Sequence, residues 1–183
     1  MTQDLDAVTL TSLARYAISQ ALRHPATAPD TEELAANGAS FVTLTQAGRL
    51  RGCIGSLRAW RPLRDDITDN AVSAALHDPR FPPLTASELP ITHIEVSVLS
   101  PSTPMSFVSR DDALAKLRPG IDGVVLSVGR HRATFLPQVW EELPEPELFI
   151  GHLMRKAGLS PSYWSDKVEI SRYTVTAFHE DSP

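Results

Sequence analysis

The stretch FVTLTQAGRLRGCIGS, residues 41–56, is the clearest structural signal in this 183-residue sequence. Apolar and polar residues alternate on both sides of Gln46-Ala47-Gly48. This pattern predicts strands over residues 41–45 and 49–56, joined by a three-residue turn with Gly48 in the left-handed conformation. Because a hairpin excludes an all-parallel sheet, the expected class is α+β, an antiparallel β-sheet with flanking helices.

The remaining chain alternates between helical and strand patterns. Its length suits one domain, residues 1–183, or one domain with a smaller lobe, and the break at Pro101 to Pro104 is the expected lobe boundary. We expect Trp60, Trp140 and Trp164 to be core or lobe-interface aromatics. The periodicity predicts helices over residues 4–23, 62–76, 109–117, 137–143 and 147–157, and strands over 91–100, 123–128, 132–136 and 168–178.

Composition narrows the class of protein. The net charge of −5 argues against a general nucleic-acid binder. One cysteine excludes an internal disulfide, and neither a cationic, apolar leader nor a long apolar run is found, so we expect a cytoplasmic protein that does not enter a membrane. Metal-ligand spacings, phosphate loops and dinucleotide fingerprints are missing, so we expect neither a metal site nor a cofactor.

Arginine is concentrated around the hairpin. Residues 41–64 contain five arginines and no acid, whereas the flanking segments are net acidic. A local positive field favours a small anionic ligand or an acidic partner surface. The alternative is that these side chains are solvated edge residues whose stems lie on apolar neighbours. The five are Arg49, Arg51, Arg58, Arg61 and Arg64.

The cysteine of the hairpin, Cys53, is the first candidate for chemistry. Strand alternation places it on the face of Arg51, whereas Leu50, Gly52 and Ile54 share the other face. A nearby cation makes a thiol a better nucleophile, so Cys53 and Arg51 are the candidate catalytic pair. Free cysteine is, however, usually a small buried hydrophobe, and the nearby sequence supplies no general base.

Two glycines flank this thiol. Glycine is disfavoured within a strand unless another group approaches the backbone closely. We therefore expect Gly52 and Gly55 to admit a substrate beside Cys53, with Ile54 as a further contact. The structural alternative is that the segment only holds two lobes together.

Leu50-Arg51-Gly52-Cys53-Ile54-Gly55 resembles the hallmark LRGCIG of the AMMECR family. Further segments match in family order, and the resemblance covers roughly residues 10–178. The version over residues 136–140 is similar to prokaryotic members called AmmeMemoRadiSam system protein A. The other matching segments are Asp78-Pro79-Arg80-Phe81-Pro82-Pro83, Glu88-Leu89-Pro90, Val96-Ser97-Val98-Leu99, Pro119-Gly120 with Gly123, and Thr134-Phe135-Leu136-Pro137-Gln138-Val139-Trp140.

This resemblance implies a two-lobed α+β protein whose LRGCIG segment lines a cleft between the lobes. It also implies a system with a Memo-like protein and a radical S-adenosylmethionine protein. The chain lacks the C-x-x-x-C-x-x-C cluster motif, so it is not expected to be the radical enzyme itself. From the matching segments we expect Arg80 to bind an anionic group of the substrate and Gln138 to form a hydrogen bond with it.

Our leading hypothesis is an enzyme, or an enzyme subunit of that system, that uses the Cys53 thiol on a small anionic or modified substrate. The alternative is a non-catalytic binding or scaffold module. Such a module recruits the Memo-like and radical S-adenosylmethionine proteins, or a nucleotide, through the arginine-rich surface.

Overall fold

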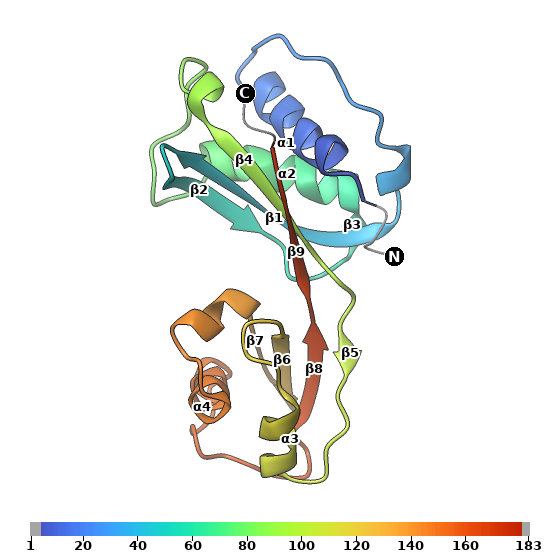
Figure 1. Ribbon diagram of the computed structural model, residues 1–183, viewed down its shortest axis with the longest axis vertical. Coiled ribbons are helices and arrows are strands. Elements are labelled where there is room, and N and C mark those ends of the chain that lie inside the picture. The colour runs from blue at the N-terminus through green and yellow to red at the C-terminus, as the bar shows by residue number, and fades with distance from the viewer. Residues whose placement is uncertain (1–4, 181–183) are drawn as a thin grey trace. The chain divides into compact units, whose positions relative to one another are not determined.

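The computed structural model describes residues 5–180, which form two compact units (Figure 1). Unit 1 contains the described residues up to Ser100 and those from Thr176, and unit 2 is Pro101–Val175. The helices are α1 (Ala7–Ala21), η1 (Glu32–Leu34), α2 (Leu63–Leu76), η2 (Leu89–Ile91), α3 (Arg110–Lys116), η3 (Pro137–Glu141) and α4 (Pro146–Lys156). The strands are β1 (Asn37–Gln46), β2 (Arg49–Gly55), β3 (Arg61–Pro62), β4 (His93–Leu99), β5 (Thr103–Pro104), β6 (Gly123–Val128), β7 (His131–Phe135), β8 (Glu169–Tyr173) and β9 (Val175–His179).

Unit 1 is a sheet covered on one face by two helices. The strand order is β2-β1-β4-β9, and β3 also pairs with β1. The central strand β1 is antiparallel to β2, β3 and β4. In Figure 1, α1 and α2 lie on the same side of this sheet, and β2 is an edge strand because it ends the strand order.

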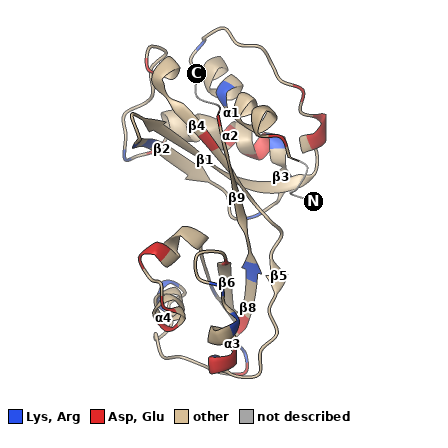
Figure 2. Cartoon of the chain, in the orientation of Figure 1, with Lys and Arg blue, Asp and Glu red and all other residues tan. Residues whose placement is uncertain are grey.

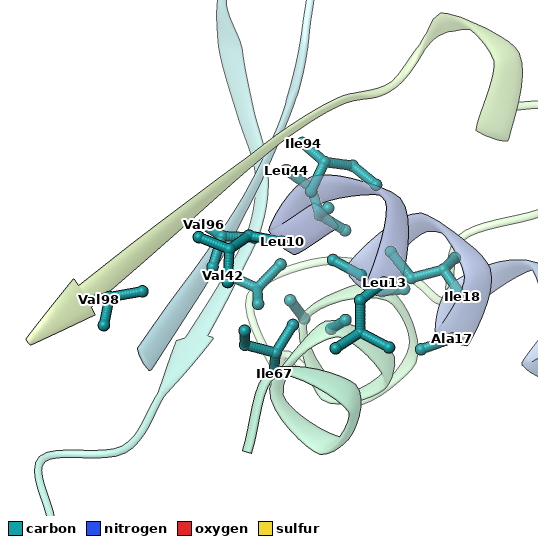
Figure 3. Packing of buried hydrophobic residues seen from close by; sticks show 14 of the residues in the cluster. Leu10, Leu13, Ala17, Ile18, Val42, Leu44, Ile67, Ile94, Val96 and Val98 are labelled. Carbon is teal, nitrogen blue, oxygen red and sulfur yellow. The ribbon is translucent and has the colours of Figure 1, made fainter. Parts of the chain in front are cut away.

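Helix α1 begins where Asp6 accepts a hydrogen bond from the Thr9 backbone N–H at 3.0 Å. Apolar residues at helical spacing then face the sheet, as Figure 3 shows for Leu10, Leu13 and Ile18. Alternate residues of β1 and β4 pack against these helix residues, so the core lies between the helices and one sheet face. Of these sheet residues, the apolar Val42, Leu44 and Val96 are fully buried.

The hairpin is confirmed, but its turn is shorter than expected. Gln46 pairs with Arg49, so Ala47 and Gly48 form a two-residue connection. Both have positive φ, 47° and 75°. Positive φ at both central residues is the requirement of the tight hairpin turn that matches the twist of the strands. The sequence predicted a longer turn because alanine rarely adopts a positive φ.

Unit 2 has its own sheet and core. The strand order is β5-β8-β6-β7, with antiparallel pairing throughout. Helix α4 contributes Phe149, which stacks on Trp140 with ring centroids 3.7 Å apart and planes 7° from parallel. The indole N–H of Trp140 donates to the Asp122 carbonyl at 2.7 Å, so the buried ring leaves no polar group unsatisfied.

The expected α+β class, with antiparallel sheets and flanking helices, is confirmed. The last strand expected over residues 168–178, with an irregularity before Val175, is divided there into β8 in the sheet of unit 2 and β9 in that of unit 1. Trp140 is a core residue as expected, whereas Trp60 is 67% exposed. The cleft between lobes stays a prediction. Across residues 5–180, no helix is both long and apolar enough to span a bilayer.

Candidate functional site

Cys53 lies on the edge strand β2, with its side chain on the sheet face opposite the helices. It pairs with Thr43 of β1, whose hydroxyl oxygen is 3.4 Å from the Cys53 Sγ. Val42 and Leu44, on either side of Thr43, are fully buried against the helices, so Thr43 and Cys53 point the other way. Cys53 is half-buried and lies outside the apolar core of unit 1. Its sulfur is therefore not a core packing group.

The Cys53 backbone is held by one pair of residues, Asp78 and Arg80. The Cys53 N–H donates to Asp78 Oδ2 at 2.9 Å, and Arg80 Nη2 donates to the Cys53 carbonyl at 3.2 Å. Both backbone groups thus point away from β1, which makes Thr43 and Cys53 a non-hydrogen-bonded pair, the arrangement in which facing side chains lie closest. The pair also satisfies edge groups that would otherwise be open to another strand.

A β-bulge interrupts β2 just before the thiol. The register shifts so that Leu44 pairs with Gly52 and Thr45 pairs with Leu50, which leaves Arg51 as the extra residue. The alternation therefore slips by one position. Leu50 lies on the face opposite to the one expected, and Arg51 is not placed by simple alternation.

The Arg51 side chain is bound to the loop that follows α2. Its Nε and Nη2 donate to the Glu88 carboxylate at 3.1 and 3.3 Å, and its Nη1 donates to the Pro82 carbonyl at 2.9 Å. The Arg51 guanidinium is thus bound by Glu88 and Pro82, and its expected role beside the thiol stays a prediction. The guanidinium that the structure brings to Cys53 is that of Arg80.

The glycines of the segment make room for protein groups. A Cβ on Gly52 would lie 2.1 Å from the Ala74 carbonyl oxygen, because α2 packs directly on β2. A Cβ on Gly55 would lie 2.2 Å from the ring of Phe41. The space expected for a substrate above Gly52 is thus filled by a helix. Ile54 also packs against the core of unit 1, on the helix side.

Opposite charges dominate the electrostatics of this edge. Hydrogen bonds from the Arg80 guanidinium, with smaller contributions from the Cys53 and Arg80 backbone N–H groups, hold the pKa of Asp78 well below its ordinary range in spite of burial. Hydrogen bonds from Arg51, together with those from Thr85, lower the pKa of Glu88 to about 2. The pKa of Arg80 is raised, mainly by its hydrogen bond to Asp78.

Asp78 is therefore expected to make the fold acid-sensitive. A carboxylate with a depressed pKa in the folded protein stabilises it fully above the unfolded pKa, about 4, and this contribution is lost as pH falls toward the folded pKa. Asp78→Asn should be less stable than the wild type at neutral pH, and the difference should narrow below about pH 4.

Urea unfolding across the pH range measures this difference. Glu88→Gln is the matched second variant, and its difference should narrow as pH falls toward about 2, the folded pKa of Glu88. A difference between wild type and Asp78→Asn that stays constant down to low pH would show that the charge of Asp78 adds nothing to stability.

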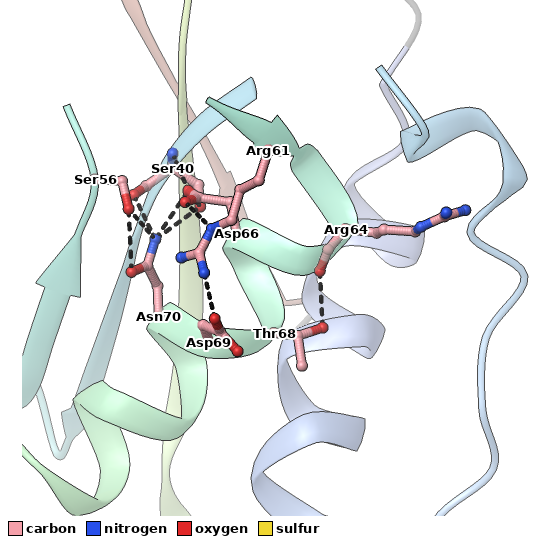
Figure 4. A network of polar contacts seen from close by, with 8 residues as sticks. All are labelled: Ser40, Ser56, Arg61, Arg64, Asp66, Thr68, Asp69 and Asn70. Carbon is pink, nitrogen blue, oxygen red and sulfur yellow. Dashed lines mark hydrogen bonds and ion pairs between the residues drawn. The ribbon is translucent and has the colours of Figure 1, made fainter. Parts of the chain in front are cut away.

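The arginine-rich stretch does not form one free basic surface. Figure 4 shows Arg61 pointing into a polar network, where its Nε donates to the fully buried Asp66 at 2.9 Å. Burial works against its charge, but hydrogen bonds and charges of Asp66 and Asp69 raise its pKa overall. Figure 2 shows acidic and basic residues interspersed within each unit. In the part of the chain that the structure describes, only Arg49 and Arg58 of the five arginines lack a hydrogen bond or ion pair to another side chain.

The last expected site residue lies in the other unit. Gln138 is an exposed residue of η3, whereas the other expected site residues belong to unit 1. The structure brings Cys53 and Arg80 together, and a joint role with Gln138 stays a prediction.

Sequence reasoning missed the carboxylates of this edge. Asp78 and Glu88 hold Arg80 and Arg51, yet neither was named as a site residue. The available signal was the segment Asp78-Pro79-Arg80, in which an acid and an arginine lie two residues apart.

This chain is similar to known proteins over most of its length. Residues 11–178 match the AMMECR1 family. A protein from Methanothermobacter thermautotrophicus is 39% identical over 181 residues, which cover 94% of this chain and 93% of that protein. A protein from Thermococcus onnurineus is 36% identical, covering 95% of this chain and 90% of its own. The crystal structure of the uncharacterised protein PH0010 from Pyrococcus horikoshii superposes with a TM-score of 0.75 at 32% identity, covering 95% of this chain and 91% of that one.

Proposed function

The chain belongs to the AMMECR1 family, and from this premise and the geometry at Cys53 we propose that it binds a small anionic or modified substrate, with Cys53 as its reactive thiol and Arg80 as the substrate's cationic partner. The observation that supports the proposal is the hydrogen bond from Arg80 to the Cys53 carbonyl at the edge of the sheet, while the Cys53 side chain lies on the face that α1 and α2 leave uncovered. We also propose that the chain is of the prokaryotic AmmeMemoRadiSam type and that it is located in the cytoplasm.

The thiol has the properties that a binding or reacting group needs. It is half-buried, and its polar neighbour is the Thr43 hydroxyl. The backbone hydrogen bonds to Asp78 and Arg80 fix its position, because they tie β2 to the loop after α2. A reactive group held by a rigid frame loses little orientational freedom when a substrate binds.

Arg80 keeps donors for a ligand. Its Nε and Nη2 bind Asp78 and the Cys53 carbonyl, whereas its Nη1 has no hydrogen bond within residues 5–180, and the side chain is 54% exposed. A guanidinium can bind a carboxylate or phosphate through such remaining N–H groups. This supports an anionic group on the substrate.

The charge of Arg80 is expected to control how Cys53 reacts with anionic reagents. In the wild type, iodoacetate should react well relative to neutral iodoacetamide. Arg80→Gln should lower the iodoacetate-to-iodoacetamide rate ratio about three- to ten-fold, since a partly screened pair of opposite charges contributes roughly 1 kcal/mol. Alkylation that is quenched at a series of times and analysed by mass spectrometry gives both rates.

Two control variants make this test specific. Arg80→Lys keeps the charge and should keep most of the ratio, and the exposed Arg58→Gln should leave it unchanged. If Arg80→Gln slows both reagents equally, the residue supports the local fold and does not attract the anion, and the proposal fails.

One observation favours a non-catalytic binding module as a second candidate. In the loop between β2 and β3, the apolar Leu57 and Trp60 are exposed on either side of the exposed Arg58. Such a surface suits a protein partner, here the Memo-like or radical S-adenosylmethionine protein. With purified partners, Arg58→Glu should then abolish binding, whereas Cys53→Ser should keep it. If only Cys53→Ser loses cellular function, the result favours the first candidate, in which Cys53 is the reactive thiol.

A further inference from the structure

Unit 2 contains a hollow of about 770 Å³ between residues 104–109 and residues 164–171. Its floor is apolar, since Met105, Val168 and Ile170 are buried residues of the unit 2 core. Two half-buried aromatic rings, Phe107 and Trp164, meet at its side with centroids 5.6 Å apart and planes at 53°. A hollow of this volume is large enough for a small ligand.

The first wall of the hollow is fixed by hydrogen bonds. The Met105 N–H donates to the Ile170 carbonyl at 2.8 Å, which continues the pairing of β5 with β8. Beyond it, Lys116 Nζ donates to the Ser106 carbonyl at 2.9 Å, and the Val108 N–H donates to Asp112 at 3.0 Å.

The second wall is a turn held by Ser165. Its Oγ accepts the Lys167 N–H at 3.2 Å, and its carbonyl accepts the Val168 N–H at 3.3 Å. Both walls are thus positioned by the protein itself, so the aromatic side of the hollow is formed before any ligand arrives.

The ionisable side chains that line this hollow are both acidic. Among its lining residues, the ionisable side chains are Asp166 and Glu169, both exposed. Within residues 5–180, neither carboxylate forms a hydrogen bond or an ion pair, whereas Asp112 and Asp122, which do not line the hollow, are each paired with a cation. Lys167 lies between the two acids in sequence but does not line the hollow.

We propose that this hollow binds an organic cation, an ammonium or guanidinium group on a short aliphatic chain. The ring faces of Trp164 and Phe107 attract a cation, and an indole does so best. Asp166 and Glu169 then supply the opposite charge, and the floor of Met105 and Ile170 receives the aliphatic chain. This chemistry occurs in a lysine or arginine side chain of a partner protein and in a free aliphatic amine.

The test is a titration of the full chain with 1,5-diaminopentane, followed by NMR of the tryptophan indole N–H groups. We expect the Trp164 signal, identified by its loss in Trp164→Phe, to shift and saturate. The signals of buried Trp140 and of Trp60 in unit 1 serve as internal controls and should stay in place. The neutral analogue 1,5-pentanediol should leave the Trp164 signal unchanged.

The carboxylates are tested separately. Asp166→Asn combined with Glu169→Gln should weaken diamine binding about five-fold or more, because two exposed charges each contribute up to roughly 1 kcal/mol and a five-fold change in Kd is itself about 1 kcal/mol. Asp111→Asn, an exposed acid outside the hollow, should not change the affinity. Added salt should weaken binding to the wild type.

Several results would overturn the proposal: no shift of Trp164 at saturating diamine, an equal shift with the diol, or unchanged affinity in the double variant. A blocked tripeptide with a central lysine distinguishes the two sources of the cation. Tighter binding of the tripeptide than of the diamine assigns the hollow to a basic segment of a partner protein, and the reverse order assigns it to a free amine.

Discussion

Gly52→Ala is expected to destabilise the protein by about 3 kcal/mol or more, the upper end of the cost of overpacking a core. The added Cβ would lie 2.1 Å from the Ala74 carbonyl oxygen and 3.1 Å from its carbon. These are backbone atoms of α2, so relief requires the helix to move away from β2. Buried Ala71 and Ala75 lie on the same helix and share its small-residue face, so the whole contact would open. Urea unfolding at neutral pH measures the loss.

Two other glycines serve as controls for this substitution. Gly48→Ala meets no atom within 4 Å but keeps a φ of +75°, so it should cost only about 1 kcal/mol of backbone strain. Gly55→Ala meets the Phe41 ring, and the double variant with Phe41→Ala should recover part of the loss. A Gly52→Ala protein within 1 kcal/mol of the wild type would mean that α2 does not press on β2 as described.

Asp66→Ala is expected to cost about 3–5 kcal/mol, the usual effect of removing one partner from a buried ion pair. The carboxylate is fully buried and accepts hydrogen bonds from the Ser40 N–H and hydroxyl at 2.8 Å, from Asn70 Nδ2 at 2.9 Å and from Arg61 Nε at 2.9 Å (Figure 4). Removing it leaves these donors without their common acceptor. Thermal or urea unfolding reports the effect.

The adjacent residue gives the matched control. Asp65 is exposed in the first turn of α2, and Asp65→Ala should change stability by less than about 1 kcal/mol. Asp66→Asn keeps the shape and removes the charge, so it should be intermediate. Equal stability of Asp66→Ala and Asp65→Ala would show that the network does not hold β1 to α2.

Local signals in the sequence predicted the elements well. The hairpin was found because the strands on both sides of Ala47-Gly48 alternate, and the start of α3 was found because Ser109 caps it, accepting the Asp112 N–H at 3.1 Å. Such signals depend on neighbours within a few residues. They are readable without knowledge of the rest of the fold.

The site was predicted only in part, since its contacts are long-range. Strand alternation did not predict the position of Arg51, because the bulge depends on how β1 pairs with β2. The role of Gly52 depends on where α2 packs, 22 positions further along at Ala74. The Asp66 network joins residues 26 and 30 positions apart, so no local pattern reveals it.

The reactivity of Cys53 in the folded protein tests the central claim most directly. The measurement is the rate constant for its reaction with iodoacetate, in the folded protein and in the same chain unfolded in urea, at one pH and ionic strength. With the thiol on the uncovered sheet face and Arg80 bound at its carbonyl, the folded protein should react at least as fast as the unfolded chain. A folded protein that protects Cys53 about a hundred-fold or more, so that labelling waits for unfolding, would contradict the account and leave LRGCIG as a packing segment.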